Sequence, residues 1–254
     1  MPIINPIIAM KPFLFSALLI ITSAIAVACQ PKPQPPVANQ STASKISATE
    51  LDNQEKAGFN SEIYLLANPD VAKLIQEGKF KSALDHYEKV GKSGKNPKGE
   101  AIEGYFTGTS GNDTVTGFGQ SPALTGVNFE IVSDQKGPFP IRPKTLGVGE
   151  VDTLVATKGS NNEFLLGSFI TVVNPKAEPF YVGKGDADYA RIQNFTKSKD
   201  AITLAGQPQQ YKFETVKGNF RILTASGDLI AIVEGIDKLE AGKVSKQYGM
   251  FPLK

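Results

Sequence analysis

The second half of the chain consists of short apolar runs separated by Gly, Asp and Asn, and this pattern limits its fold more than any other feature. Residues 100–254 contain the runs "TLVAT", "FYVG", "AITLAG", "NFRILTA" and "DLIAIVEG". Runs this short, bounded by turn-forming residues, predict strands rather than helices. The 24 glycines and the absence of Trp fit a turn-rich protein. The sequence therefore predicts a mainly β domain over residues 100–254.

Two stretches refine that expectation. The segment "NFRILTASGDLIAIVEG" predicts a hairpin, because Ser226, Gly227 and Asp228 supply a turn in which Gly227 tolerates a positive φ. Residues 120–146 carry four prolines, so we expect a loop there with at most one strand, at "NFEIV".

A degenerate repeat begins at Gly108. In "GTSGNDTVT", Gly108, Gly111, Asp113 and Val115 occupy the spacing of the nonapeptide Gly-Gly-x-Gly-x-Asp-x-apolar-x. In such a repeat the glycines permit a tight turn, the Asp points into it, and the apolar residue starts a short strand. Stacked turns form a parallel β-roll in which calcium lies between successive turns.

Two further copies are weaker. "GVGEVDTLV" keeps Asp152 but has Glu150 in place of a glycine, and "GSNNEFLLG" has Asn161 where an Asp is expected. Calcium takes six to eight oxygen ligands, so a single turn is only part of a site. One copy alone is therefore not a site, whereas two stacked copies among those of Asp113, Asp152 and Asn161 can form one.

A second acidic group lies in "GKGDADYARIQNFTKSKD". Asp186 and Asp188 would point the same way on a strand, and Asp200 follows them. These three residues are candidates for a terminal calcium site. Asp and Asn also cap turns by accepting hydrogen bonds from backbone amides, and the sequence leaves both interpretations open.

These motifs carry a resemblance. From "GVGEVDTLV" through "FYVGKGDADYARIQNF" and "DAITLAG" to "GDLIAIVEG", the chain resembles the RTX-like, hemolysin-type calcium-binding domain of cyanobacterial proteins over roughly residues 104–240. The resemblance implies a mainly β fold, a short degenerate RTX-like β-roll closed by antiparallel strands and preceded by a small α-helical module. It also implies structural calcium and no catalysis, although the clean "GGxGxDxF" turn of the family is missing here.

Residues 59–99 predict three short helices. Asn60 or Ser61 can cap the first, Pro69 starts the second, and Gly91 ends the third. The segment "YLLANPDVAKLIQEGKFKSALDHYEKVGK" resembles a helical module of secreted bacterial proteins, one that implies no activity. His86 is the single histidine of the chain and is expected to pack rather than bind metal.

The N-terminus predicts export. Residues 1–28 read as a lipoprotein-type signal peptide, with Met1 or Met10 as the start, and "AVAC" resembles a lipobox whose cysteine, Cys29, receives lipid. An ordinary cleaved signal is the alternative. Residues 29–58, rich in Pro, Gln and Ser, predict a disordered tether. We thus expect an exported lipoprotein of the cell envelope or cell surface, held to the membrane through Cys29.

Other functions find less support. Hydrolase, zinc-protease and Walker motifs are absent from the sequence, so an enzyme is not expected. A net charge of +2 argues against nucleic acid. The alternative to calcium binding is a metal-free adhesion or scaffold module for envelope polysaccharide or a surface protein. A row of exposed aromatics at Phe180, Tyr181 and Tyr189 would favour it, although a core role is the better interpretation of these residues.

Overall fold

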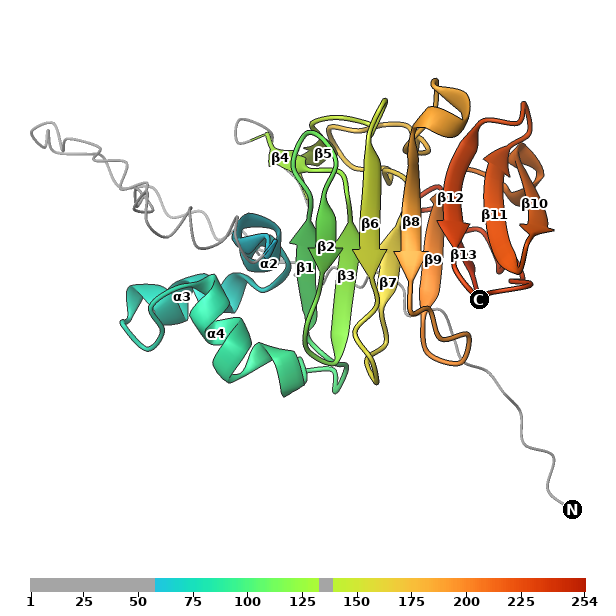
Figure 1. Cartoon of the computed structure of the whole chain (residues 1–254). Helices are drawn as coiled ribbons and strands as arrows, with labels where there is room; N and C mark the ends of the chain where they lie inside the picture. The colour runs from blue at the N-terminus through green and yellow to red at the C-terminus, as the bar shows by residue number, and fades with distance from the viewer. Residues whose placement is uncertain (1–57, 133–138) are drawn as a thin grey trace, which may run out of the picture. The chain divides into compact units, whose positions relative to one another are not determined.

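A computed structural model describes residues 58–132 and 139–254 of the chain. The signal peptide, Cys29 and the tether lie outside the described residues. The described part is mainly β, a β-solenoid of about three turns with a few short helices and antiparallel strands at the sheet edges. The fold class predicted from the sequence is therefore confirmed. Figure 1 shows the strands of the solenoid side by side, with the helices at its N-terminal end.

Two sheets make up the solenoid, and the chain alternates between them. The first sheet has the order β1 (Glu103–Thr107), β3 (Ser121–Thr125), β7 (Glu163–Leu165), β9 (Ala201–Ala205) and β13 (Met250–Leu253). Its first four strands are parallel, and β13 is antiparallel to β9. The inward side chains of both sheets form the core, in which Leu124, Leu154, Phe164 and Ile192 are fully buried.

The second sheet continues the same winding. Its order is β10 (Tyr211–Val216), β11 (Asn219–Thr224), β12 (Leu229–Val233), β8 (Tyr189–Gln193), β6 (Val151–Val155) and β2 (Thr114–Thr116). The four strands β2, β6, β8 and β12 are parallel, whereas β10, β11 and β12 pair antiparallel. The expected hairpin at Ser226–Asp228 is confirmed, with Gly227 at φ 98°. The β10–β11 turn also has positive φ at Lys217 and Gly218.

The expectation of a loop over residues 120–146 is wrong in its first part. Residues 121–125 form β3, a buried strand between β1 and β7 in the first sheet. The segment "QSPALTG" hides this strand because its apolar run is short and contains Pro122, a residue that central strands disfavour. Residues 129–131 form the expected strand β4 (Phe129–Ile131), which pairs with β5 (Ile141–Pro143) in a separate two-stranded sheet.

The predicted helices are present as α2 (Ser61–Ala67), α3 (Pro69–Gln76) and α4 (Ala83–Lys89). The side chain of Asn60 accepts a hydrogen bond from the amide of Ile63, and Ser82 does the same for Asp85, as N-cap residues do. Short 3₁₀ turns η1 (Gly91–Ser93), η2 (Gly185–Ala187) and η3 (Pro208–Gln210) occur later in the chain.

The helical segment covers the start of the solenoid. The amide of Asn60 donates to the carbonyl of Tyr105 at 2.7 Å, and the amide of Thr107 donates to the carbonyl of Gly58 at 2.8 Å. Residues 58–60 thus satisfy the outer edge of β1, which would otherwise expose unpaired backbone groups. The Phe59 ring contacts the ring of Phe106 at a centroid distance of 5.7 Å.

Tyr87 joins the helices to the sheets. Its fully buried side chain donates a hydrogen bond to the carbonyl of Phe118 at 2.6 Å. The ring leaves no room for a side chain at its neighbours, because a Cβ at Gly104 or Gly119 would lie 2.3 Å from the Tyr87 hydroxyl. These glycines are required by the close approach of the helical segment.

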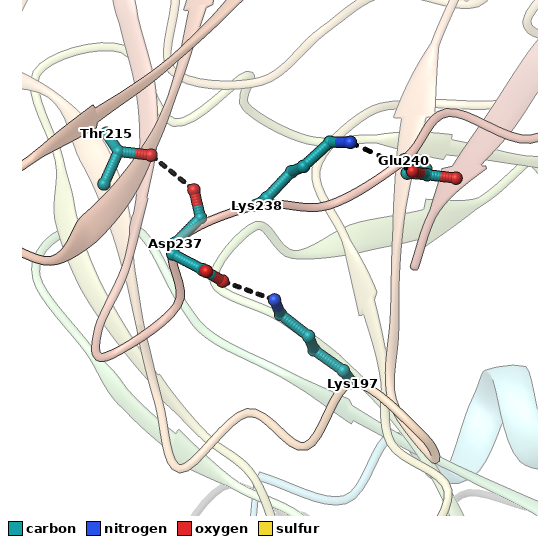
Figure 2. Close-up of polar contacts among 5 residues, drawn as sticks. All are labelled: Lys197, Thr215, Asp237, Lys238 and Glu240. Carbon is teal, nitrogen blue, oxygen red and sulfur yellow. Dashed lines mark hydrogen bonds and ion pairs between the residues drawn. The ribbon is translucent and has the colours of Figure 1, made fainter.

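Residues 237–240, called the strap below, follow β12 at the end of the solenoid opposite the helices, and Figure 2 shows their polar contacts. Lys197 and Asp237 form an ion pair, and the hydroxyl of Thr215 donates to the main-chain carbonyl of Asp237. On the same segment, Lys238 Nζ lies 3.1 Å from Glu240 Oε1. These charges are exposed, so each pair adds little to stability. The strap contacts β10 through the side chain of Thr215 and, within the described residues, makes no main-chain hydrogen bond to that strand.

Within the described ranges, no helix has both the length and the apolar character needed to cross a membrane.

We predict that Gly104→Ala destabilises the helices and the solenoid together. The added methyl overlaps the Tyr87 ring, and overpacking of this kind costs about 1–3 kcal/mol. Thermal unfolding followed by circular dichroism should show one transition at a lower temperature. Thr114→Ala, at an exposed position of β2, is the control and should leave the midpoint nearly unchanged. A separate, lower helical transition with an unchanged β transition would contradict this prediction.

Candidate functional site

Acidic residues gather where the parallel strands of the second sheet begin. Thr114 pairs with Thr153, so Asp113, directly before β2, lies beside Asp152, the second residue of β6. Val151 pairs with Tyr189, which places Glu150 beside Asp188 at the start of β6 and β8. The strands alternate their side chains, so Glu150 and Asp152 share the inner side. Glu150 is 9% exposed, and Asp152 and Asp188 are 0% exposed.

Asp152 is satisfied by two neighbouring segments. Its Oδ1 accepts a hydrogen bond from the amide of Asp113 at 2.8 Å, and its Oδ2 accepts one from the hydroxyl of Tyr181 at 2.7 Å. The first of these bonds links two successive turns of the solenoid. Burial raises the pKa of Asp152, and these two hydrogen bonds partly oppose the rise.

Glu150 and Asp188 are satisfied only in part. Asp188 Oδ2 accepts a hydrogen bond from the amide of Gly149 at 3.1 Å, again across two turns. Its Oδ1 and the Oε2 of Glu150 are buried and have no hydrogen-bond partner. Burial raises the pKa of Glu150, and the negative charges of Asp152 and Asp113 raise it further.

Asp228 lies directly before β12, as Asp188 lies directly before β8, although its local sequence predicts only a turn. Its Oδ2 accepts a hydrogen bond from the amide of Gly183, and its Oδ1 is buried without a partner. The pattern is that of Asp188, one turn earlier. The missed signal is the spacing, since an acidic residue (Asp113, Glu150, Asp188 and Asp228) directly precedes each of the parallel strands β2, β6, β8 and β12.

Asp113, Glu150, Asp152 and Asp188 form a row of acidic side chains, called the acidic row below. Within the described ranges, no Lys or Arg side chain pairs with the buried members of this row. None of the ion pairs there includes Glu150, Asp152 or Asp188. Buried carboxylates are costly unless they are paired, protonated or bound to a metal. The row is therefore destabilising when it is ionised. A cation or a proton bound at its unpartnered oxygens would reduce this cost in free energy.

Asp200 and Asn161 lie away from Glu150, Asp152 and Asp188, and the side chain of Asp113 already accepts hydrogen bonds. Asp113 accepts hydrogen bonds from the amide and hydroxyl of Thr109 in its own turn. Asp200 is buried, and its two oxygens are used by the backbone and side chain of Asn162 and by the amide of Thr196. Asn161 is exposed. Asp113 and Asp200 therefore cap turns, which is the role that the sequence left open for Asp200.

The expectation that Asp186 and Asp188 point the same way is wrong. Asp186 belongs to the 3₁₀ turn η2, not to a strand, and its exposed side chain forms an ion pair with Arg221 at 3.2 Å. A 3₁₀ turn does not share the two-residue period of a strand, so alternation in the sequence does not place the two carboxylates on one side. The structure brings together Asp113, Glu150, Asp152 and Asp188, and leaves Asp186, Asn161 and Asp200 elsewhere.

His86 and two aromatic candidates are core residues. His86 is buried, its Nδ1 lies 2.8 Å from the hydroxyl of Tyr64, and burial lowers its pKa. Phe180 and Tyr181 are fully buried, while Tyr189 is half-buried on β8. The packing role expected for these rings is confirmed for Phe180 and Tyr181, so the three do not form an exposed row.

The donors of the acidic row suit a hard cation. They are carboxylate oxygens, which calcium prefers together with main-chain carbonyls and water. Among the described residues, no group of three or more His, Cys, Asp or Glu side chains is arranged to hold a metal ion. Any calcium here would thus need main-chain or water oxygens to complete its coordination.

Comparison of the chain with protein-family models finds no match, and comparison with curated proteins finds none either.

Proposed function

We propose that the solenoid is a calcium-binding domain whose ion has a structural role. The observation that carries the proposal is the pair of buried, unpartnered carboxylate oxygens, Glu150 Oε2 and Asp188 Oδ1, at the start of adjacent parallel strands. Glu150 and Asp188 would supply the charged ligands, and oxygens of the turns around Gly149 would supply the others. The ion would cross-link two successive turns.

Electrostatics favours a cation over an empty site near neutral pH. The pKa of Glu150 is raised by burial and by the charges of Asp152 and Asp113. In the absence of a counter-charge, the charges of Asp152 and Asp113 thus oppose the ionisation of Glu150. A divalent cation reverses the sign of that interaction, because it attracts every carboxylate in the row.

The expected affinity is low. Calcium modules of the extracellular space bind on the order of 10⁻⁴ to 10⁻³ M, and a site with two carboxylates and neutral oxygens belongs to that range. Such a site fills only where calcium is plentiful. This agrees with the export that the N-terminal segment predicts, and we include in the proposal that the chain is a lipoprotein of the cell envelope, anchored at Cys29.

Calcium should raise the melting temperature of the full chain. For a dissociation constant near 10⁻³ M, 10 mM calcium adds about 1.4 kcal/mol, which corresponds to a few degrees for a domain of this size. Differential scanning fluorimetry in mild detergent should show this increase, and 10 mM magnesium should give less, because magnesium demands a stricter geometry.

Matched variants locate the effect. Glu150→Gln and Asp188→Asn should each abolish the calcium-dependent increase in melting temperature. The control is Asp186→Asn, which should retain the increase, because Asp186 is two residues from Asp188 but is exposed and paired with Arg221. An increase that survives both Glu150→Gln and Asp188→Asn would contradict the proposed ligands. No increase in the unmodified chain would exclude the calcium function, and a metal-free scaffold would be the function to test next.

The calcium-free chain should lose stability as pH rises, through Glu150. Because its pKa is raised in the folded state, folded Glu150 binds a proton more tightly than unfolded Glu150. Glu150 therefore contributes to the free energy of unfolding at low pH. This contribution is lost as the pH rises above the unfolded pKa of about 4.3. In a chelator, Glu150→Gln should raise the melting temperature by a few degrees at pH 7.5 and hardly at all at pH 4. An equal shift at both pH values would show that Glu150 does not titrate in this way.

A further inference from the structure

We propose that two copies of this chain associate through the free edge of β10, with the β10 strands antiparallel and Phe213 on the two-fold axis. β10 is the outermost strand of the second sheet at its C-terminal end (Figure 1). With six residues it is as long as any strand in the described ranges. The proposal does not depend on calcium.

The turn between β10 and β11 determines which backbone groups are free. Two residues, Lys217 and Gly218, connect the strands, and Val216 pairs with Asn219. In a two-residue hairpin the flanking residues form the first hydrogen-bonded pair, and the pattern then alternates. The backbone groups of Phe213 and Thr215 therefore point away from β11. Across the described residues, no main-chain group outside the ladder hydrogen-bonds to them.

Other edges of the solenoid are covered. Residues 58–60 pair with β1, and bridges from Ala241 to Leu253 and from Ser245 to Met250 line β13. The remaining edge, β2, has only three residues. Proteins commonly protect exposed edges by shortening or covering them, so the uncovered β10 edge is the one suited to pair with another strand.

The side chains of β10 select a second copy as the partner. In the antiparallel register that places Phe213 opposite Phe213, Lys212 lies opposite Glu214 of the other copy, and the same pair occurs again by symmetry. Lys212 and Glu214 are exposed on the same face of the strand. Oppositely charged residues directly across a strand pair attract, whereas like charges repel.

The neighbouring contacts are compatible with this register. On the outer face, Glu214 pairs with Arg221 at 3.0 Å, so in the dimer it would lie between two cations. On the inner face, Phe213 is half-buried and its ring stacks on Phe220 at a centroid distance of 5.7 Å. The Thr215 hydroxyl donates to the main-chain carbonyl of Asp237 (Figure 2). This side-chain contact does not use the backbone groups of Thr215.

Disulfide trapping tests the register directly. Cys29 is the single cysteine, so Cys29→Ser gives a background in which an introduced cysteine is the only one. Phe213→Cys should cross-link the full chain in mild detergent under oxidising conditions, because residues in a hydrogen-bonded antiparallel pair have Cα atoms about 5.5 Å apart, within disulfide range. Val216→Cys is the matched control and should not cross-link, since its two copies would lie roughly 20 Å apart.

A charge exchange tests the recognition. In the Phe213→Cys background, Lys212→Glu or Glu214→Lys should each lower the rate of cross-linking roughly tenfold, because each turns two attractive pairs into repulsive ones. The double exchange should restore the rate, and the melting temperature of each variant reports whether it is folded. Equal cross-linking at residues 213 and 216, no cross-linking at 213 in a folded variant, or no rescue by the double exchange would overturn the proposal.

Discussion

The solenoid depends on one recurring interaction, an Asp side chain that accepts a hydrogen bond from the main chain of another turn. Asp152 takes the amide of Asp113, Asp188 takes the amide of Gly149, and Asp228 takes the amide of Gly183. Hydrogen bonds to a charged acceptor are among the stronger ones in proteins. They satisfy the turn amides that no strand pairs, and they hold neighbouring turns in register. The same interaction concentrates negative charge at one corner of the fold.

The sequence predicts much of the fold because its signals are local. Glycines at turns, an Asp before a short apolar run and the Ser226–Asp228 hairpin all depend on residues that are close in the chain. Strand β3 was missed because its position in the sheet follows from packing between β1 and β7, while its own sequence contains Pro122. Local preference is a weak guide where the rest of the fold determines the strand.

The candidate site was harder to predict because ligation depends on what each carboxylate already binds. Asp113, Asp152 and Asp200 match the pattern, but hydrogen bonds from neighbouring segments use their oxygens. Glu150 replaces a glycine of the repeat and would be discounted by a motif, yet it has a free buried oxygen. Only the register of β6 against β8 shows that it lies beside Asp188.

The winding of the chain also sets how the protein must fold. Strands that are adjacent in each sheet are far apart in sequence, as in the pairs Thr114–Thr153 and Val151–Tyr189. Each such pair closes a long loop before any contact repays the lost entropy, so the contact order is high, which predicts slow folding. The helical segment lies against β1, where the first turn begins. Early formation of this segment would give the first strand a surface to dock on, and the solenoid could then grow in one direction, from the N-terminal end toward β13.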